Sequence, residues 1–318
     1  MLHRCLVAQS PVRPELRRLG GELVGSIGSL ASWRHARGAI SLEAPRLLGI
    51  INVTPDSFSD GGRLTSVSDA ISHGERLVSE GADILDVGGE STRPQGAQPV
   101  TLEEELRRVI PVIRGLSSRL PNTPLSVDTT KSEVARAAIA AGASIVNDVS
   151  GLRFDPIMAE MCAASGAGVI VMHSRGAVRD MATYTHAVYG DDVVGEVLEE
   201  LRERLTLAQS AGIPRDRIAV DPGIGFAKRS HHSLEVVAGL RRVAALGYPV
   251  LVGLSRKRFI GELSGQTVAS QRDAATAGAN CAALERGARL FRVHDVLLNR
   301  HALDTAWPII AFNASSPK

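Results

Sequence analysis

The stretch PLSVDTTKSEVARAAIAAGASIVNDVSG, residues 124–151, contains one complete repeat of the fold. It includes a short apolar run, Pro124–Val127, which predicts a β-strand. An amphipathic stretch follows at Lys131–Ala141 and predicts a helix, and a second apolar run at Ser144–Val146 predicts the next strand. A strand, a helix and a strand in this order indicate two parallel strands joined by a crossover helix.

The same unit recurs along the chain from about residue 45 to residue 310. Most of the predicted strands are nearly continuous in Val, Ile and Leu, as expected when both faces of a parallel strand are covered. The other strands are predicted at Leu47–Val53, Ala82–Val87, Gly168–Met172, Arg217–Val220, Pro249–Leu254 and Arg289–Val293. The other helices are predicted at Val67–Ser79 after Thr65 and Ser66, Leu102–Leu116 after Thr101, Pro156–Ser165, Val193–Ala211, His232–Leu246, Arg272–Arg286 and Asp295–Ile310. Eight such units favour a single (β/α)8 barrel over residues 45–318, although an open doubly wound sheet can show a similar pattern.

Residues 1–44 are read as an N-terminal extension that is partly disordered. The extension is rich in arginine and poor in acids, as transit peptides are, but it has no compact apolar block followed by a cleavage site. Within it, Trp33–Leu42 carries an Arg37-Gly38 turn signal. We expect this segment to form a β-hairpin that plugs the N-terminal end of the barrel.

Composition excludes several classes of protein. The formal net charge is +2 and the 36 basic residues are spread along the chain, which argues against a nucleic-acid partner. No apolar run approaches the ~20 residues that a membrane helix needs. The three cysteines, Cys5, Cys162 and Cys281, are far apart and form no metal-ligand set, which fits a reducing compartment. A cytoplasmic enzyme is the expectation.

Polar residues stand at the end of every predicted strand. In a barrel of this type the chemistry lies at the carboxyl ends of the strands and in the loops that follow them. The residues at these ends are Asn52, Asp86, Asp128, Asn147 with Asp148, His173, Asp221, Ser255 with Arg256 and Lys257, and Arg292 with His294 and Asp295. A purely structural barrel has no reason to gather so many polar groups on one rim.

These residues fall into two chemical sets. Asp128, Asn147 and Asp221 are short hydrogen-bonding groups suited to the edge of a flat nitrogen heterocycle, as carboxylates are to a base edge. The second set supplies donors and hydroxyls from strands that become neighbours when the barrel closes, and it resembles an anion clamp. It consists of Asn52, Thr92, Arg93, Arg292 and His294, with Lys257 between the two sets. The combination predicts a planar heterocycle that carries an anionic group.

Each residue taken alone also has an ordinary structural interpretation. Asp128 and Asp148 could each cap the helix that follows. His173 and Met172 could belong to the core, and His231-His232 could be a surface pair. The functional interpretation depends on the joint placement of these residues.

Seven segments of the chain resemble the dihydropteroate synthase family, in that family's order. They are NVTPDSFSDGG (52–62), DVGGESTRP (86–94), VDTTK (127–131), NDVSG (147–151), DPGIGFAK (221–228), SRK (255–257) and RVHDV (292–296). The resemblance covers the chain from about residue 45 to residue 310. It implies a pterin-binding barrel enzyme of folate biosynthesis.

The resemblance also implies roles for individual residues. Asp128, Asn147, Asp221 and Lys257 would hold the pterin ring, with Arg292 on its face and Met172 nearby. Asn52 would meet Mg2+ and the pyrophosphate, whose oxygens Thr92, Arg93, Arg292 and His294 would bind. The 4-aminobenzoate pocket would comprise Phe58, Thr92, Pro94, Phe226, Lys257 and Arg258. The catalytic groups would be Asp60, Asp128, Arg93, Lys257, Arg292 and His294.

The reaction implied is the condensation of a dihydropterin pyrophosphate with 4-aminobenzoate. The family further implies Mg2+ as cofactor, sulfonamides as inhibitors and a homodimer formed through barrel helices. The chain departs from the common pattern at Arg258, where Ser is frequent, at Ser174, where Met is frequent, and at Gln95, which looks like an insertion. These departures bear on 4-aminobenzoate affinity and on sulfonamide sensitivity.

Two alternatives to the synthase stay open at the level of sequence. A corrinoid-linked pterin methyltransferase shares the barrel and the pterin-reading set, but it has no need of Arg93, Arg292 and His294 as a pyrophosphate clamp. A homologue that binds pterin without turnover is the other alternative. A turnover assay distinguishes both from the synthase.

Overall fold

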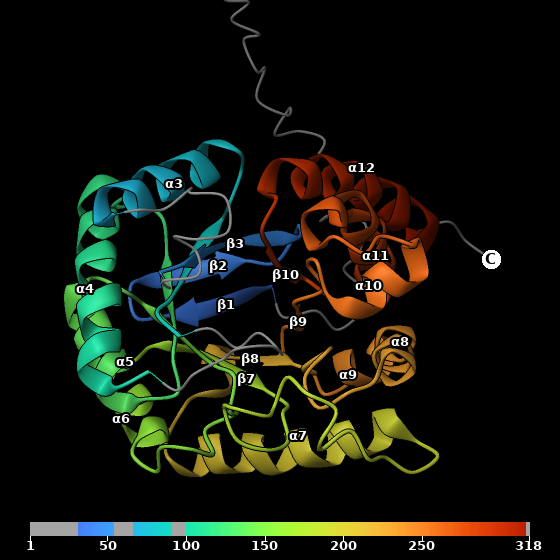
Figure 1. The fold of residues 1–318 in the computed structure, drawn as a ribbon, viewed down its shortest axis with the longest axis horizontal. Coiled ribbons are helices and arrows are strands. Elements are labelled where there is room, and N and C mark those ends of the chain that lie inside the picture. Colours follow the sequence, from blue (N-terminus) through green and yellow to red (C-terminus); the bar gives the residue numbers. More distant parts are fainter. Residues whose placement is uncertain (1–30, 54–65, 91–99, 316–318) are drawn as a thin grey trace, which may run out of the picture.

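Eight parallel strands surround one axis and a ring of helices covers them on the outside (Figure 1). The structure is a computed structural model that describes residues 31–53, 66–90 and 100–315. The barrel strands are β3 (Arg46–Asn52), β4 (Ile84–Gly88), β5 (Leu125–Asp128), β6 (Ile145–Asp148), β7 (Gly168–Met172), β8 (Ile218–Asp221), β9 (Leu251–Val252) and β10 (Leu290–Val293). All eight predicted strands are confirmed, with ends that differ by at most two residues.

The order of the strands around the axis is β8-β7-β6-β5-β4-β3-β10-β9, and every pair is parallel. The two ends of this row meet through a parallel bridge between Val220 and Val250. There the backbone N–H of Val220 donates to Pro249 O at 2.9 Å. The row therefore closes on itself, and the expected barrel is confirmed over the open sheet.

The helices lie where the apolar periodicity predicts them, with two differences. They are α3 (Val67–Ser79), α4 (Leu102–Arg119), α5 (Ser132–Ala141), α6 (Met158–Ser165), α7 (Val193–Ser210), α8 (Ser230–Ala238), α9 (Leu240–Ala244), α10 (Arg258–Ser264), α11 (Asp273–Glu285) and α12 (Val296–Ser315). Short 3-10 turns cover Arg215–Arg217 and Ala269–Gln271. The N-caps predicted at Ser66 and Thr101 are confirmed, because their side chains accept bonds from Asp69 N at 3.2 Å and Glu104 N at 3.3 Å.

The prediction of one helix over His232–Leu246 is wrong, because Gly239 divides that stretch into α8 and α9. A Cβ at Gly239 would lie only 2.7 Å from Val194 Cγ2, so α7 packs directly against the backbone at the break. Periodicity alone does not reveal such a close approach. The second difference is α10, a short helix on the loop after β9 whose bounds were not predicted.

The predicted plug at the N-terminal end of the barrel is confirmed. β1 (Ser32–His35) and β2 (Gly38–Ser41) pair antiparallel through a turn at Ala36 and Arg37, one residue earlier than the turn signal. Trp33 is 0% exposed and its indole N–H donates to Arg217 O at 2.9 Å. The apolar side chains of the hairpin pack against the first residues of the barrel strands in one cluster that contains Trp33, Ile40, Leu42, Leu48, Ile84, Ile145, Ile170, Ala219, Leu251 and Leu290.

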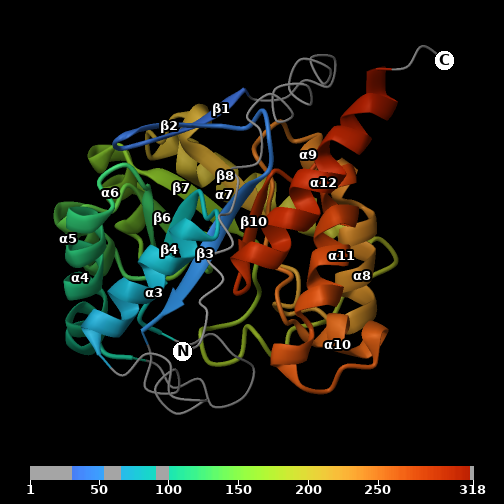
Figure 2. The same ribbon diagram turned by 90° about the horizontal axis from the view of Figure 1, so that it is seen from above.

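Figure 2 shows the hairpin lying across one end of the barrel, while the β3 arrow points away from it and α10 lies at the other end. One end of the barrel interior is thus filled with apolar side chains. The polar strand ends named above therefore meet at the opposite end, which is the only end left for chemistry within the part of the chain that the structure describes.

Two further observations concern the exclusions drawn from composition. Among the helices of the described residues, none is both long and apolar enough to span a membrane. Cys162 is buried and Cys281 is partly buried, and both are free thiols, while Cys5 lies outside the described residues.

Candidate functional site

The centre of the site is an arginine held between two carboxylates. Arg292, near the end of β10, donates from Nε to Asp86 Oδ2 at 2.6 Å and from Nη2 to Asp128 Oδ2 at 2.8 Å. Asn147, near the end of β6, donates from Nδ2 to the same Asp86 Oδ2 at 3.2 Å. The structure thus brings Asp128 and Asn147 of the first predicted set together with Arg292 of the second, and places the buried Asp86 among them.

Burial and charge act against each other in this cluster. Burial raises the pKa of Asp128 to about 7, and the attraction of Arg292 opposes that rise. Burial alone would lower the pKa of Arg292, but the carboxylates of Asp86 and Asp128 more than offset this and raise it. The guanidinium is therefore a permanent positive charge at this end of the barrel, and it lies in direct contact with the Asp128 carboxyl group.

Asp221 and Lys257 face each other across the next part of the site. Asp221 Oδ1 accepts from Gly223 N at 2.7 Å, which leaves the other carboxylate oxygen for a ligand. Burial raises the pKa of Asp221, and Lys257 counteracts this; burial lowers the pKa of Lys257 to about 8, against the attraction of Asp221. The Lys257 ammonium donates to Ile224 O and lies 4.5 Å from the centre of the Phe226 ring. The predicted residues Asp221, Phe226 and Lys257 are therefore neighbours.

The loop after β8 depends on glycine at one position in particular. Gly223 has φ +65°, and a Cβ there would lie 1.8 Å from His173 O, in the backbone of the adjacent strand end. Any side chain at this position would push the loop away from β7. The loop carries both the Asp221 end of the strand and Phe226, so this close contact sets the distance between them.

The buried side chain of Lys228 holds the loop after β8 in place. Lys228 is 2% exposed, and its ammonium contacts His173 Nδ1 at 2.8 Å and donates to Gly223 O at 3.1 Å and to Phe226 O at 3.2 Å. Burial lowers the pKa of Lys228 to about 7. When Lys228 is charged it can only donate, so Nδ1 of His173 is then the acceptor and the ring proton is on Nε2. Glu200 Oε2 lies 3.2 Å from that Nε2. His173 is thus a buried core histidine, as its ordinary interpretation has it, although the approach of Glu200 to Nε2 does not have hydrogen-bond geometry.

His173 is expected to make stability depend on pH between about 4 and 6.5. Burial, and then Lys228, lower its pKa from 6.5 to about 4. The unfolded chain therefore binds more protons in this window, and the free energy of unfolding falls as the pH drops through it, by up to ~3 kcal/mol from this residue. His173→Gln keeps an acceptor for Lys228 and removes the titration. Urea unfolding of both proteins at several pH values measures the difference, and parallel curves would contradict the assignment.

His294 is oriented by the neighbouring strand end. Ser255 Oγ accepts from the backbone N–H of His294 at 3.2 Å and lies 2.9 Å from His294 Nδ1. When the single hydroxyl proton of Ser255 points to Nδ1, the ring proton of His294 is on Nε2. The imidazole can then donate that proton to an anion, which is the role predicted for it.

The remaining predicted residues that the structure describes are Asn52 at a strand end, Met172 in the core and Arg258 on the surface. Asn52 is the last residue of β3, at the site end of the barrel. Met172 is 3% exposed and packs in a cluster with Phe226, so it is part of the core. Its predicted place near the pterin is compatible with that position. Arg258 is exposed, and its guanidinium lies 4.7 Å from the centre of the Tyr184 ring.

Two of the ordinary interpretations are settled by contacts. Asp148 accepts from Ser150 N at 2.7 Å and Leu152 N at 3.0 Å, so it stabilises a turn. The N-cap of α6 is Ile157, so the interpretation of Asp148 as a cap of the following helix is wrong. His232 is 8% exposed with its ring 4.9 Å from that of Tyr189, so the prediction of a surface pair is wrong for His232.

Ser174 is one of the positions at which the chain departs from the common family pattern. Its hydroxyl accepts from Arg153 Nη2 and donates to Val149 O.

Several predicted residues lie outside the described residues. They are Phe58 and Asp60 in the first loop and Thr92, Arg93 and Pro94 in the second, together with Gln95. Their roles therefore stay predictions. Among the described residues no group of three His, Cys, Asp or Glu side chains is placed to hold a metal ion.

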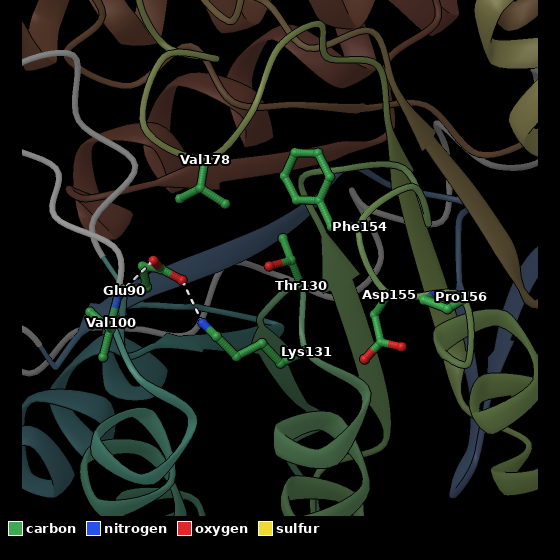
Figure 3. Close-up of a pocket in the computed structure, with 8 residues that line it drawn as sticks. All are labelled: Glu90, Val100, Thr130, Lys131, Phe154, Asp155, Pro156 and Val178. Atoms are coloured by element: carbon green, nitrogen blue, oxygen red, sulfur yellow. Dashed lines mark hydrogen bonds and ion pairs between the residues drawn. The ribbon is translucent and has the colours of Figure 1, made fainter.

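A cavity of about 330 Å3 lies beside the two ends of the second loop (Figure 3). Glu90, where that loop begins, accepts from the backbone N–H of Val100, where it ends, at 3.0 Å and from Lys131 Nζ at 2.9 Å. Lys131 also donates to Glu105 at 2.6 Å. Figure 3 shows Phe154 and Val178 on the far side of this cavity from Glu90 and Lys131. One carboxylate thus ties both ends of the second loop to the loop after β5.

Replacing Lys131 with methionine is expected to lower the free energy of unfolding by about 3 kcal/mol, because Glu105 is 0% exposed and would be left as an unpaired buried charge. Urea unfolding measures the change. The double variant Lys131→Met with Glu105→Gln removes that charge and should recover part of the loss. A loss below ~1 kcal/mol in the single variant, or no recovery in the double variant, would contradict this account.

Three residues of the site were not assigned a role from the sequence. Asp86 and Ser255 were noted only as polar strand ends and as members of a segment, and Lys228 only as the last residue of its segment. The available signal for Asp86 is its position as a charged residue inside the apolar run Ile84–Gly88. No pattern along the chain pairs Lys228 with His173, since the contact joins residues 55 positions apart.

The comparisons with known proteins agree with this geometry. The family model described as "Pterin binding enzyme" matches residues 48–294. The dihydropteroate synthase of Streptococcus pyogenes serotype M6 is 45% identical over 255 residues, which are 80% of this chain and 91% of that protein.

Solved structures of the same enzyme superpose closely on the chain. The Xanthomonas albilineans dihydropteroate synthase with 4-aminobenzoic acid is 48% identical with a TM-score of 0.80, and the same enzyme with 7,8-dihydropteroate is 46% identical with a TM-score of 0.78. Each match covers 88% of this chain and 98% of the other. The Yersinia pestis dihydropteroate synthase with a sulfonamide drug complex is 35% identical, with a TM-score of 0.81 and coverage of 90% and 100%.

Proposed function

The chain belongs to the pterin-binding enzymes and, within them, to the dihydropteroate synthases, and from this premise we propose how its residues carry out that reaction. The enzyme is a transferase that joins a dihydropterin pyrophosphate to 4-aminobenzoate and releases 7,8-dihydropteroate and pyrophosphate. The observation that carries the proposal is the bond between Arg292 and Asp128, which sets an anion-binding cation beside a ring-reading carboxylate. A heterocycle that carries an anion on a one-carbon arm fits this pairing.

The pterin ring is read by groups at the carboxyl ends of β5, β6 and β8. Asp128 and Asp221 each offer carboxylate oxygens to the N–H groups of the aminopyrimidine edge. Asn147 presents its amide oxygen, because its nitrogen is bonded to Asp86. Lys257 donates to a ring acceptor from its place beside Asp221, and Met172 contacts the ring as part of the apolar wall.

The leaving group is the pyrophosphate, and the site stabilises its charge. The bond between the exocyclic CH2 carbon and the pyrophosphate oxygen breaks, and the electron pair leaves with the oxygen. Arg292 and the Nε2 proton of His294 meet that developing charge, together with Thr92 and Arg93 from the second loop. Asp128, with Asp60 of the first loop, favours the positive charge that the pterin acquires.

Mg2+ is the cofactor that we propose for this step. The amide oxygen of Asn52 is a ligand of the kind that Mg2+ prefers, and the ion commonly completes its shell with water and substrate phosphates. Since the described residues offer no metal cluster of their own, the ion would depend on pyrophosphate oxygens for binding. Bound there, it would supply further positive charge to the leaving group.

The nucleophile is the amine of 4-aminobenzoate. Its nitrogen lone pair forms the new bond to the CH2 carbon, and the nitrogen then loses a proton to solvent. An arylamine is a free base near neutral pH, so positioning it over the carbon replaces a dedicated base. We propose that Phe226 and Lys257, with Phe58, Thr92 and Pro94 of the loops, form its pocket. Arg258 would act at the edge of that pocket.

A turnover assay with dihydropterin pyrophosphate, 4-aminobenzoate and Mg2+, following pyrophosphate release, tests the function. We expect product formation that depends on both substrates. Intact pterin binding with no product above a boiled control would favour the non-catalytic homologue, and methyl transfer to a corrinoid would favour the methyltransferase.

Further proposals concern the setting in which the enzyme works. We propose that sulfonamides compete with 4-aminobenzoate, as arylamines of similar shape. We also propose that the chain works in the cytoplasm as a homodimer joined through helices of the barrel. Size-exclusion chromatography with light scattering measures the oligomeric state.

A further inference from the structure

Asp86 is a buried carboxylate in the middle of an apolar strand. It is the third residue of β4, it is 0% exposed, and its neighbours Leu85 and Val87 are also buried. Removing a carboxylate from water is costly unless other groups satisfy its charge. The hydrogen bonds of Asp86 must therefore offset the cost of its burial, and they indicate that it has a function in the site.

Asp86 joins strands on both sides of β4. One of its oxygens, Oδ2, accepts from Arg292 of β10 and from Asn147 of β6, each of which is two strands away around the barrel. Its other oxygen, Oδ1, is buried and has no hydrogen-bond partner among the described residues. Because alternate strands contribute side chains to one layer of a barrel, Asp86, Asn147 and Arg292 form a continuous row across the interior.

The contact with Asp86 fixes which way the Asn147 amide points. A carboxylate only accepts hydrogen bonds, so the atom of Asn147 that faces Asp86 must be its NH2 group. The amide oxygen then points away from Asp86. In the reversed orientation the amide oxygen would face a carboxylate oxygen, and the pterin would meet a donor where its own N–H group needs an acceptor.

The contact with Asp86 also holds Arg292 when substrate arrives. In the structure Arg292 has two carboxylate partners, Asp86 through Nε and Asp128 through Nη2. A pterin that bonds to Asp128 Oδ2 competes directly with Nη2 for that oxygen. Asp86 lies at 0% exposure, out of the reach of a ligand, so its bond to Nε remains.

We propose that Asp86 is a positioning residue, which keeps Arg292 aimed at the pyrophosphate and Asn147 turned as an acceptor once the pterin has displaced Arg292 from Asp128. The proposal rests on the proposed function of the site. It separates two roles for the two carboxylates around Arg292: Asp128 exchanges its partner for substrate, while Asp86 keeps its partner throughout the reaction. With Nε held, both terminal nitrogens of Arg292 are left for phosphate oxygens.

The first test is Asp86→Asn, which keeps the shape of the side chain but presents an NH2 group to one of its two donors. We expect kcat to fall by about 10- to 100-fold, the usual effect of losing a group that orients a ligand-binding residue. The affinity for inorganic pyrophosphate with Mg2+ should fall with it, while the KM for 4-aminobenzoate should change by less than about twofold. Calorimetric titration with pyrophosphate and steady-state kinetics give these values.

Asp83→Asn is the matched control. Asp83 lies just before β4, at the plugged end of the barrel, and it too is bonded to two arginines, Arg46 at 3.0 Å and Arg300 at 3.0 Å. This variant should lose stability and keep the wild-type kcat and pyrophosphate affinity. A folded Asp86→Asn variant with kcat within threefold of wild type, or with lower kcat but unchanged pyrophosphate and pterin affinity, would overturn the proposal.

A second measurement decides the case if Asp86→Asn does not fold. In wild-type protein labelled with 15N-arginine, the Arg292 Nε–H signal is identified by its loss in Arg292→Lys. We expect slow hydrogen exchange at this N–H both before and after a dihydropterin is added, because the Asp86 bond persists. Loss of protection on pterin binding would overturn the proposal. If wild-type protein binds pterin but makes no product, the proposed function fails while this measurement still tests Asp86.

Discussion

Replacing Arg292 with methionine is expected to lower kcat/KM by about 10³-fold. The substitution removes the charge that meets the departing pyrophosphate, and loss of one such preorganised donor commonly costs ~10²–10³ in rate. It also leaves Asp86 and Asp128 as neighbouring buried carboxylates with no cation between them. We therefore expect the pKa of Asp128 to rise further above its ordinary range, because burial then acts unopposed by Arg292.

Arg292→Lys should restore little of that activity, because an ammonium cannot reach two carboxylates in the geometry of a guanidinium. The control is Arg289→Met, three residues earlier on the way into β10. Arg289 donates to backbone carbonyl groups at Ala288 and Leu284 and lies 4.7 Å from the centre of the Trp307 ring. That variant should lose stability and keep kcat. Similar kcat/KM values for Arg292→Met and Arg289→Met would contradict the assigned role of Arg292.

Replacing Asp221 with alanine is expected to weaken pterin binding by about 100-fold or more. The estimate corresponds to two charge-assisted hydrogen bonds at ~1.5 kcal/mol each. The same substitution removes the attraction that opposes the burial of Lys257, so the pKa of Lys257 should fall below its present value of about 8. Near neutral pH a part of the lysine would then be uncharged. Calorimetric titration with a pterin measures the loss.

Asp216→Ala is the control for Asp221. Asp216 precedes the same strand at the plugged end and forms an exposed ion pair with Arg34 at 3.6 Å, a kind of contact that contributes little to stability. Pterin affinity should be unchanged in it. Arg93→Ala, by contrast, should impair pyrophosphate handling and spare pterin affinity. Equal losses of pterin affinity in Asp221→Ala and Arg93→Ala would contradict the division of the site into two sets.

The fold could be predicted because its signals are local. Each strand is a short run of Val, Ile and Leu, and each helix repeats its apolar residues on one face, so eight units can be counted without any contact between distant residues. The hairpin was predictable for the same reason. The break at Gly239 was not, since it depends on how closely α7 packs against that residue.

The sequence predicted which residues belong to the site, but it predicted less well which of them are bonded to each other. Strand ends converge in a barrel, so Asp128, Asn147 and Asp221 could be grouped from the sequence alone. Which of them bonds to which depends on side chains that cross the barrel, as Arg292 does to Asp86 over 206 positions of sequence. Asp128 and Asp148 illustrate the difference: both follow apolar strands, yet one holds a guanidinium and the other closes a turn.

The hairpin of β1 and β2 has a consequence for how substrates enter and products leave the enzyme. With Trp33 and its apolar neighbours filling one end of the barrel, the described residues leave only the end with the strand termini Asn52, Asp128 and Asp221 for ligands to approach. Both substrates and both products must therefore enter and leave at that end, so a product that is still bound delays the binding of the next substrate. Dihydropteroate should therefore compete with the incoming pterin substrate.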